Sequence, residues 1–170
     1  MKINLKIAII LLSGSFLFLF TNCNSSSDKE IKNAVSTFFK IQKDFREIDK
    51  NLMTPELSGL IEKAVKREEL EVEKIKNSEF PTDKPLCIEG DVFTSLYEGQ
   101  DSLNILDIKT EENKATVLIE FTNKQYKHSW KDEVILINDK GWKIDNIVFK
   151  GVDVNSKSTK DLLQSFIDFK

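Results

Sequence analysis

Few side chains in this sequence are suited to acid–base chemistry. Its 170 residues include one histidine, His128, and two tyrosines, Tyr97 and Tyr126. A catalytic acid or base is a histidine, carboxylate or tyrosine whose pKa is tuned by its surroundings. His128 lies between Lys127 and Trp130, so we interpret it as a surface residue near a strand edge. Because the sequence also lacks a Gly-rich phosphate loop and a Gly-x-Ser-x-Gly elbow, it favours a protein that is not an enzyme.

Four residues are candidates for contact with a ligand or partner: Trp130, Trp142, Asp91 and Tyr97. The tryptophans begin two adjacent predicted strands, where they could meet as cross-strand neighbours. In that position they would either pack in the hydrophobic core or form an aromatic wall that contacts a ligand or partner. Asp91 follows Gly90, which is typical of an Asx turn, and a pocket carboxylate is the alternative. Tyr97 lies in the same predicted loop.

The composition disfavours metal, disulfide and nucleic-acid chemistry. Two cysteines and one histidine make no zinc-ligand cluster, so we expect no metal and no cofactor. Lys and Arg number 25 against 28 Asp and Glu, a net charge of −3, whereas a nucleic-acid binder usually needs a basic face. We expect Cys87 to be a small buried hydrophobe. Forty per cent hydrophobic and 31% charged residues are typical of a globular chain.

Residues 1–22 have the features of an export signal. Lys2 and Lys6 precede an apolar run over residues 7–20. A stable membrane span needs roughly 20 residues, so this run fits the apolar core of a signal peptide. The run ends in Phe20-Thr21-Asn22-Cys23, which resembles a bacterial lipobox. An ordinary secretory signal, cleaved near Ser25, is the alternative.

The lipobox resemblance implies that the chain is cut before Cys23 and that its thiol is joined to diacylglycerol. The domain would then be held on a membrane by its lipid. Asn24, rather than Asp, follows the cysteine, and the sorting rule of diderm bacteria then points to the outer membrane. We expect residues 23–29, which include three serines, to be a flexible tether.

Helical periodicity predicts a first helix from Ser27, which opens a capping box with Glu30, to Leu52. Its apolar stripe is Ile31, Val35, Phe38, Ile41, Phe45, Ile48 and Leu52. Thr54-Pro55-Glu56 predicts the start of a second helix, with Thr as cap and Pro at the first position. The charges from Glu68 to Lys76 are expected to form a solvated face or a separate short helix.

From residue 103 the period becomes two, which predicts strands over residues 103–110, 115–122, 130–137 and 142–149. The second strand alternates with one strongly apolar face, and the third is apolar on both faces and therefore central. We expect Asp145 to pair with Lys143 or Lys131. Ser158 can cap a short C-terminal helix. Helices segregated from strands predict an α+β fold in which N-terminal helices pack on a curved antiparallel sheet.

Several motifs of the second half occur in a recognisable order. They are Phe80-Pro81, Glu89-Gly90-Asp91-Val92-Phe93-Thr94-Ser95, Trp130-Lys131-Asp132-Glu133-Val134 and Gly141-Trp142-Lys143-Ile144-Asp145-Asn146-Ile147, followed by a Leu-rich helix. In order and spacing they resemble the DUF3828 family of bacterial exported proteins and lipoproteins, over about residues 30–168. The resemblance implies an NTF2-like, cystatin-like cone: a bent antiparallel sheet closed by N-terminal helices. The domain division is then signal peptide 1–22, tether 23–29 and one domain over 30–170.

The resemblance implies no agreed activity, because some NTF2-like relatives are enzymes and many are binding modules or scaffolds. Two hypotheses follow. The first is a non-catalytic envelope lipoprotein that binds another envelope protein. The second is a binder of a small apolar or amphipathic ligand inside the cone. We favour the first, because the phenylalanines can fill the cone, and the expected fillers are Phe38, Phe45, Phe121 and Phe149.

Overall fold

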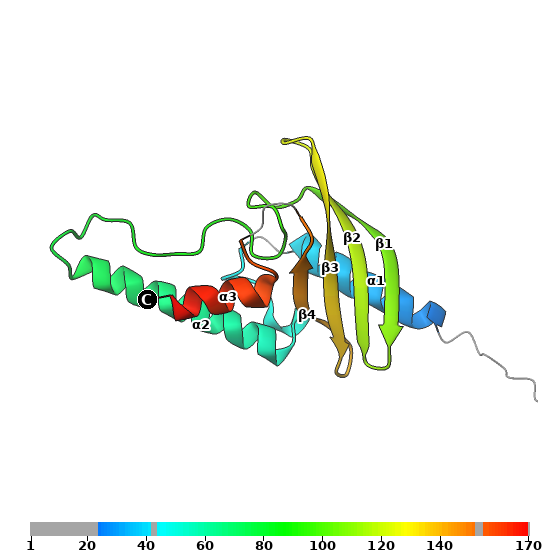
Figure 1. Ribbon diagram of the computed structural model, residues 1–170. Coiled ribbons are helices and arrows are strands. Elements are labelled where there is room, and N and C mark those ends of the chain that lie inside the picture. Colours follow the sequence, from blue (N-terminus) through cyan, green and yellow to red (C-terminus); the bar gives the residue numbers. More distant parts are fainter. Residues whose placement is uncertain (1–23, 42–43, 152–154, 170) are drawn as a thin grey trace, which may run out of the picture.

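The computed structural model describes residues 24–41, 44–151 and 155–169, and it confirms an α+β fold (Figure 1). The α-helices are α1 (Asn24–Ile41), α2 (Pro55–Lys76) and α3 (Thr159–Asp168), and a 3-10 turn, η1, spans Lys50–Leu52. The strands are β1 (Ser102–Glu111), β2 (Lys114–Asn123), β3 (His128–Asn138) and β4 (Trp142–Phe149). They form one antiparallel sheet in the order β1-β2-β3-β4. The predicted C-terminal helix is present and is capped by Ser158.

The register of the sheet explains which side chains form the core. Val117 on β2, Val134 on β3 and Ile147 on β4 lie opposite one another and are fully buried. Because side chains alternate between faces, every second residue of β2 from Ala115 to Asn123 is buried, whereas the residues between them are half-buried. The predicted apolar face of this strand and the central place of β3 are both confirmed.

Helix α1 crosses one face of the sheet, and α2 and α3 lie side by side beyond β4 (Figure 1). Ile31, Val35 and Phe38 of α1 are fully buried, as the helical stripe predicts. Thr54 accepts a hydrogen bond from the backbone N of Leu57 (3.3 Å) and so caps α2 as expected. No helix in the described ranges is both long and apolar enough to span a membrane.

The first helix is shorter than predicted. It ends at Ile41, and Phe45 reaches the core from an irregular segment instead of a helical one. Beyond this end the side chains form local bonds: Asp44 accepts a hydrogen bond from the backbone N of Arg46 (2.9 Å), and Asp49 caps η1 by accepting one from that of Asn51 (2.9 Å). Such side-chain bonds compete with helical ones. Apolar spacing alone could not reveal this break.

One further boundary differs from expectation. The structure begins α1 at Asn24, so residues 24–29, predicted as part of a tether, are helical. Helix α2 continues without interruption to Lys76, which confirms a solvated second half of this helix and not a separate short helix, since no residue from 69 to 76 is buried. Just before that segment Glu68 is buried, which places a carboxylate inside the protein.

Candidate functional site

The structure separates the two tryptophans, so the predicted cross-strand pair is wrong. Trp130 lies opposite Phe121 of β2, and Trp142 lies opposite Asn138 at the hairpin between β3 and β4. Antiparallel strands joined by a tight hairpin begin at opposite ends of the sheet. The first residues of β3 and β4 therefore cannot meet, and the tryptophans form no shared wall.

Trp130 is a core residue, and His128 stacks against it. Trp130 is 6% exposed, and its indole N donates a hydrogen bond to Asp132 Oδ2 (3.1 Å). The His128 ring lies 5.9 Å from the Trp130 ring at an interplanar angle of 11°. His128 is exposed at the first residue of β3, as the sequence indicates. Trp142 is half-buried and packs against the core.

Asp132 is a fully buried carboxylate at the centre of a hydrogen-bond network that sequence reasoning missed. Its Oδ2 accepts from the backbone N of Ser95 (2.8 Å) and from Trp130. Its Oδ1 accepts from the backbone N of Lys150 (2.8 Å) and from the Ser95 hydroxyl. A charge is buried here because four donors replace its water. The signal was available, since position 132 has the same parity as the buried positions 130, 134 and 136.

Asp91 and Tyr97 come together in the loop before β1. Asp91 Oδ1 accepts from the backbone N of Phe93 (2.7 Å), which is the expected Asx-type turn, and its own backbone N donates to the carbonyl of Tyr97 (2.8 Å). The Tyr97 hydroxyl donates to Glu89 (3.2 Å), and the side chain is 58% exposed. Both residues line a cavity of about 200 Å³ beside Ser95. Of the four candidates, only this pair is adjacent.

A second buried carboxylate, Glu68, joins α2 to two loops. It accepts from Arg46 at both oxygens (Nε and Nη2, each 2.7 Å) and from the backbone N of Ile88 (2.7 Å). Arg46 Nη2 also donates to the carbonyl of Ile88 (2.9 Å), and Nη1 contacts Asp44 (3.0 Å). The hydrogen bond to Glu68 is the main reason that the pKa of Arg46 is raised. Sequence reasoning missed this network because its members are far apart in the chain.

Asp145 pairs with Lys160, not with Lys143 or Lys131. Lys160 Nζ lies 3.0 Å from both Asp145 oxygens and 2.9 Å from Glu56 Oε2. Asp145 lies at the irregularity in the β3–β4 register, and α3 packs along the same edge of the sheet. A cavity of about 550 Å³ between α2 and α3 includes Lys160 and Glu56 in its lining. The carboxylates described so far therefore serve as acceptors within the fold, each held by donors.

A cavity of about 380 Å³ lies between α1 and the start of β1. Phe39 and Lys40 contribute from α1, and Gln100 and Leu103 contribute from the other side. Gln100 Oε1 is buried and accepts no hydrogen bond from any described residue. A buried acceptor without a partner is uncommon in folded proteins.

Of the two cysteines, the structure describes only Cys87. Cys23 and the rest of the export signal lie outside the described residues. Cys87 is a free thiol and is half-buried, less than we expected. Across the described ranges, no group of three or more His, Cys, Asp or Glu residues is placed to hold a metal ion.

Comparisons of this chain with protein-family models, with curated proteins and with solved structures found no match.

Proposed function

We propose that this protein is a non-catalytic lipoprotein of the bacterial cell envelope, anchored by a lipid on Cys23, whose folded domain binds another envelope protein. The domain is proposed to be an NTF2-like cone of the DUF3828 type. The lipobox supports the anchor, and Asn24 after the cysteine supports the outer membrane. The sheet, with α1 packed on one face, supports the cone.

The observation that carries the proposal is the aromatic packing of α1 against β2 and against the loop before β1. Phe38 meets Phe39 and Phe93 edge to face, with ring centroids 5.1 and 5.0 Å apart. Phe39 in turn meets Phe121 at 5.0 Å. Edge-to-face contacts at these distances are favourable packing. A small ligand inside the domain would need the space that these rings occupy, so this packing supports recognition at the outer surface, where the exposed Lys40 and Ser102 line the cavity beside α1.

The buried carboxylates support a non-catalytic role. A general base must reach a substrate proton and have a free lone pair for it. Asp132 accepts four hydrogen bonds, and Glu68 accepts three from Arg46 and Ile88. Asp132, which is fully buried and whose four acceptor positions are all used, could act on a proton only after part of the fold came apart.

The two cysteines provide a matched test of the anchor. We expect Cys23→Ala to abolish incorporation of a labelled fatty acid and to move the protein from the detergent phase to the aqueous phase. We expect Cys87→Ala to leave both properties unchanged, because Cys87 lies within the folded domain. If Cys23→Ala still carries the label or remains in the detergent phase, the lipoprotein assignment is wrong.

Native mass spectrometry tests surface recognition against an internal ligand. The full chain is purified in detergent from its own cells, and the spectrum is compared with the mass of the lipidated protein. A stoichiometric protein adduct without further small-molecule mass is expected. A reproducible excess of a few hundred daltons that survives mild activation would instead identify a ligand inside the domain and overturn the proposal.

A further inference from the structure

Helix α1 begins at Asn24, the residue that follows Cys23, which is proposed to carry the lipid. The position at which the sequence predicts a flexible tether is therefore the start of a helix. The 18 residues of α1 include no glycine and no proline, the residues that most often bend or break a helix. The helix thus runs from the residue after the anchor to Ile41 without a hinge.

The body of α1 is fixed to the domain along its length. Ile31, Val35 and Phe38 are fully buried, and their spacing places them on one face of the helix. Phe38 meets Phe93 edge to face with ring centroids 5.0 Å apart, and Phe39 is also buried. Because these contacts come from the middle and the end of the helix, α1 cannot pivot on the sheet and must move with the domain.

Only a short part of α1 precedes the core. Residues 24–30 come before Ile31, and at 1.5 Å per residue this helical part spans about 10 Å. The same residues in an extended tether would span up to about 24 Å. A lipid on Cys23 would thus hold the core about two helical turns from the membrane surface.

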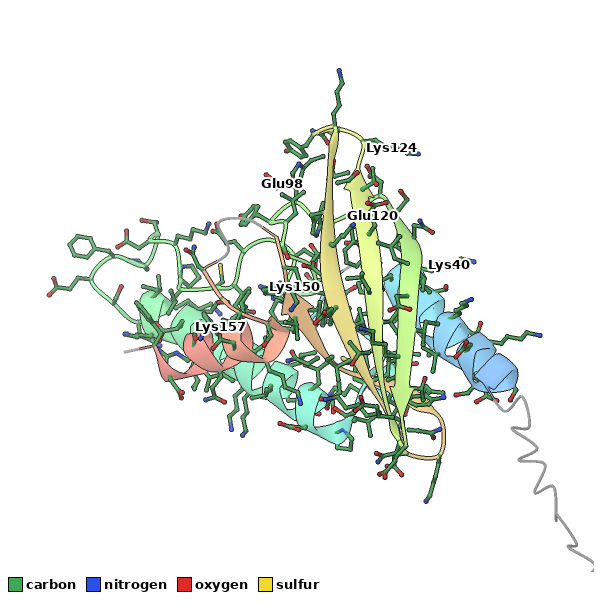
Figure 2. The ribbon with its side chains drawn as sticks, turned by 45° about the vertical axis from the view of Figure 1, so that its right-hand side comes forward. Lys40, Glu98, Glu120, Lys124, Lys150 and Lys157 are labelled. Atoms are coloured by element: carbon green, nitrogen blue, oxygen red, sulfur yellow. The ribbon has the colours of Figure 1, made fainter. Side chains whose placement is uncertain are left out.

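The start of α1 and the helices α2 and α3 lie on opposite sides of the sheet's strands (Figure 1). The start of α1 lies on the β1 side, where no strand within the described ranges pairs with the outer side of β1. At the β4 edge, the backbone N of Thr54 donates to the carbonyl of Ile144 (2.9 Å), and that of Phe149 donates to the carbonyl of Lys157 (3.0 Å). Lys157, just before α3, lies across the sheet from α1 (Figure 2).

The surface of the first turns of α1, residues 26–33, is polar and carries no net charge. Lys29 and Lys32 are balanced by Asp28 and Glu30, and no exposed residue of these turns is apolar. Such a surface has no side chain to insert among acyl chains and no net charge that attracts anionic lipid. It suits contact with lipid headgroups, while the acyl chains on Cys23 supply the binding.

We propose that α1 is a rigid connector that holds the domain directly on the lipid headgroups, with its first turns facing the membrane and with α2 and α3 facing away from it. The cavity at the other end of α1 stays accessible to the envelope partner, because Lys40 in its lining lies about 24 Å from Asn24 along the helix axis (Figure 2). This inference rests on the proposed function, since it needs the lipid on Cys23.

Fluorescence quenching at the membrane surface tests the orientation. The lipidated full chain is reconstituted into vesicles of phosphatidylethanolamine and phosphatidylglycerol, in which some headgroups carry a nitroxide quencher. In a Cys87→Ser background, a fluorophore is attached to the new thiol of Lys29→Cys or, as the control, of Ser165→Cys, an exposed position of α3. We expect at least about threefold quenching at position 29, which lies about 8 Å from Asn24 along the helix, and none at position 165.

A linker insertion distinguishes a rigid connector from a flexible one. About twelve Gly and Ser residues, which span about 20 Å, are inserted between Asn24 and Ser25, before the first buried residue. We expect quenching at position 29 to fall to the level at position 165. The same insertion between Thr82 and Asp83, in an exposed loop, should leave the quenching unchanged. Added salt should also leave it unchanged, because the charges of the first turns balance.

Three results would overturn the inference while the lipid anchor stands. Equal quenching at positions 29 and 165 would show that the domain has no preferred orientation. Quenching that persists after the insertion before Ser25 would show that the helix is not what holds the domain. Loss of quenching in salt would assign the contact to charge attraction. If instead the wild-type chain incorporates no labelled fatty acid, the proposed anchor itself is rejected, and the connector with it.

Discussion

Asp132 occupies a position where the alternation of β3 requires a buried side chain. Its carboxylate connects the loop at Ser95, the ring of Trp130 and the backbone after β4 at Lys150. Burial of a charge is costly unless every acceptor is used. At the scale of single residues, the interior thus depends on a few polar side chains whose partners come from distant parts of the chain.

We expect Asp132→Asn to lower the free energy of unfolding by about 3 kcal/mol. The amide keeps the shape of the side chain but turns an N–H₂ group toward at least one buried donor. Urea denaturation measures the loss, with Asp139→Asn on the exposed β3–β4 hairpin as the control. Equal stability of the two variants would contradict a structural role for the buried network.

The contact between Glu68 and Arg46 makes a second prediction at this scale. Glu68→Gln should reduce the free energy of unfolding by about 1–3 kcal/mol, because the new amide N–H₂ faces a guanidinium that has only N–H donors. Glu69→Gln, at the exposed neighbouring position, should be neutral. If chemical denaturation gave the same midpoint for Glu68→Gln and Glu69→Gln, this prediction would be contradicted.

At the scale of elements, two glycines show how helix and loop use the same residue differently. Gly90 has φ of 78°, and a Cβ placed on it would lie 2.5 Å from Tyr97 Cδ2. Gly59 lies in α2, and nothing would come within 4 Å of its Cβ. The loop therefore needs glycine for its conformation and for the close approach of Tyr97, whereas the helix does not.

Alanine substitution should separate these two positions in thermal denaturation. Gly90→Ala should destabilise the protein by about 1–3 kcal/mol, because the left-handed conformation and the contact with Tyr97 both oppose a side chain. Gly59→Ala should stabilise it by about 0.5–1 kcal/mol through helix propensity. A neutral Gly90→Ala would mean that the loop can rearrange freely around Asp91.

At the scale of the whole molecule, the sheet is closed at β4 and open at β1. This asymmetry predicts the pattern of hydrogen exchange, since local stability follows burial and pairing. We expect amides of β2 and β3 to exchange most slowly and those of β1 to exchange faster in the purified full chain. Equal protection of β1 and β2 would contradict an open edge at β1.

The elements with strong periodicity can be predicted from local sequence alone. The alternation from Ala115 to Phe121 follows from the two faces of a strand, and Thr54 and Ser158 mark helix starts by the bonding of their hydroxyls. The α+β class follows from the order of these elements. The lipobox at Cys23, which lies outside the described residues, stays a sequence-based prediction.

The distances between elements, in contrast, depend on how the whole chain packs. The separation of Trp130 from Trp142 depends on strand direction, and the pairing of Asp145 with Lys160 depends on where α3 packs. Glu68 has the same pattern of charged neighbours as a solvated residue, yet it is buried because Arg46 folds back over α2. The local sequence indicates which backbone conformation a segment prefers and at what spacing its buried residues recur. The contacts of a polar side chain depend on residues far away in the chain, and folding alone brings these together.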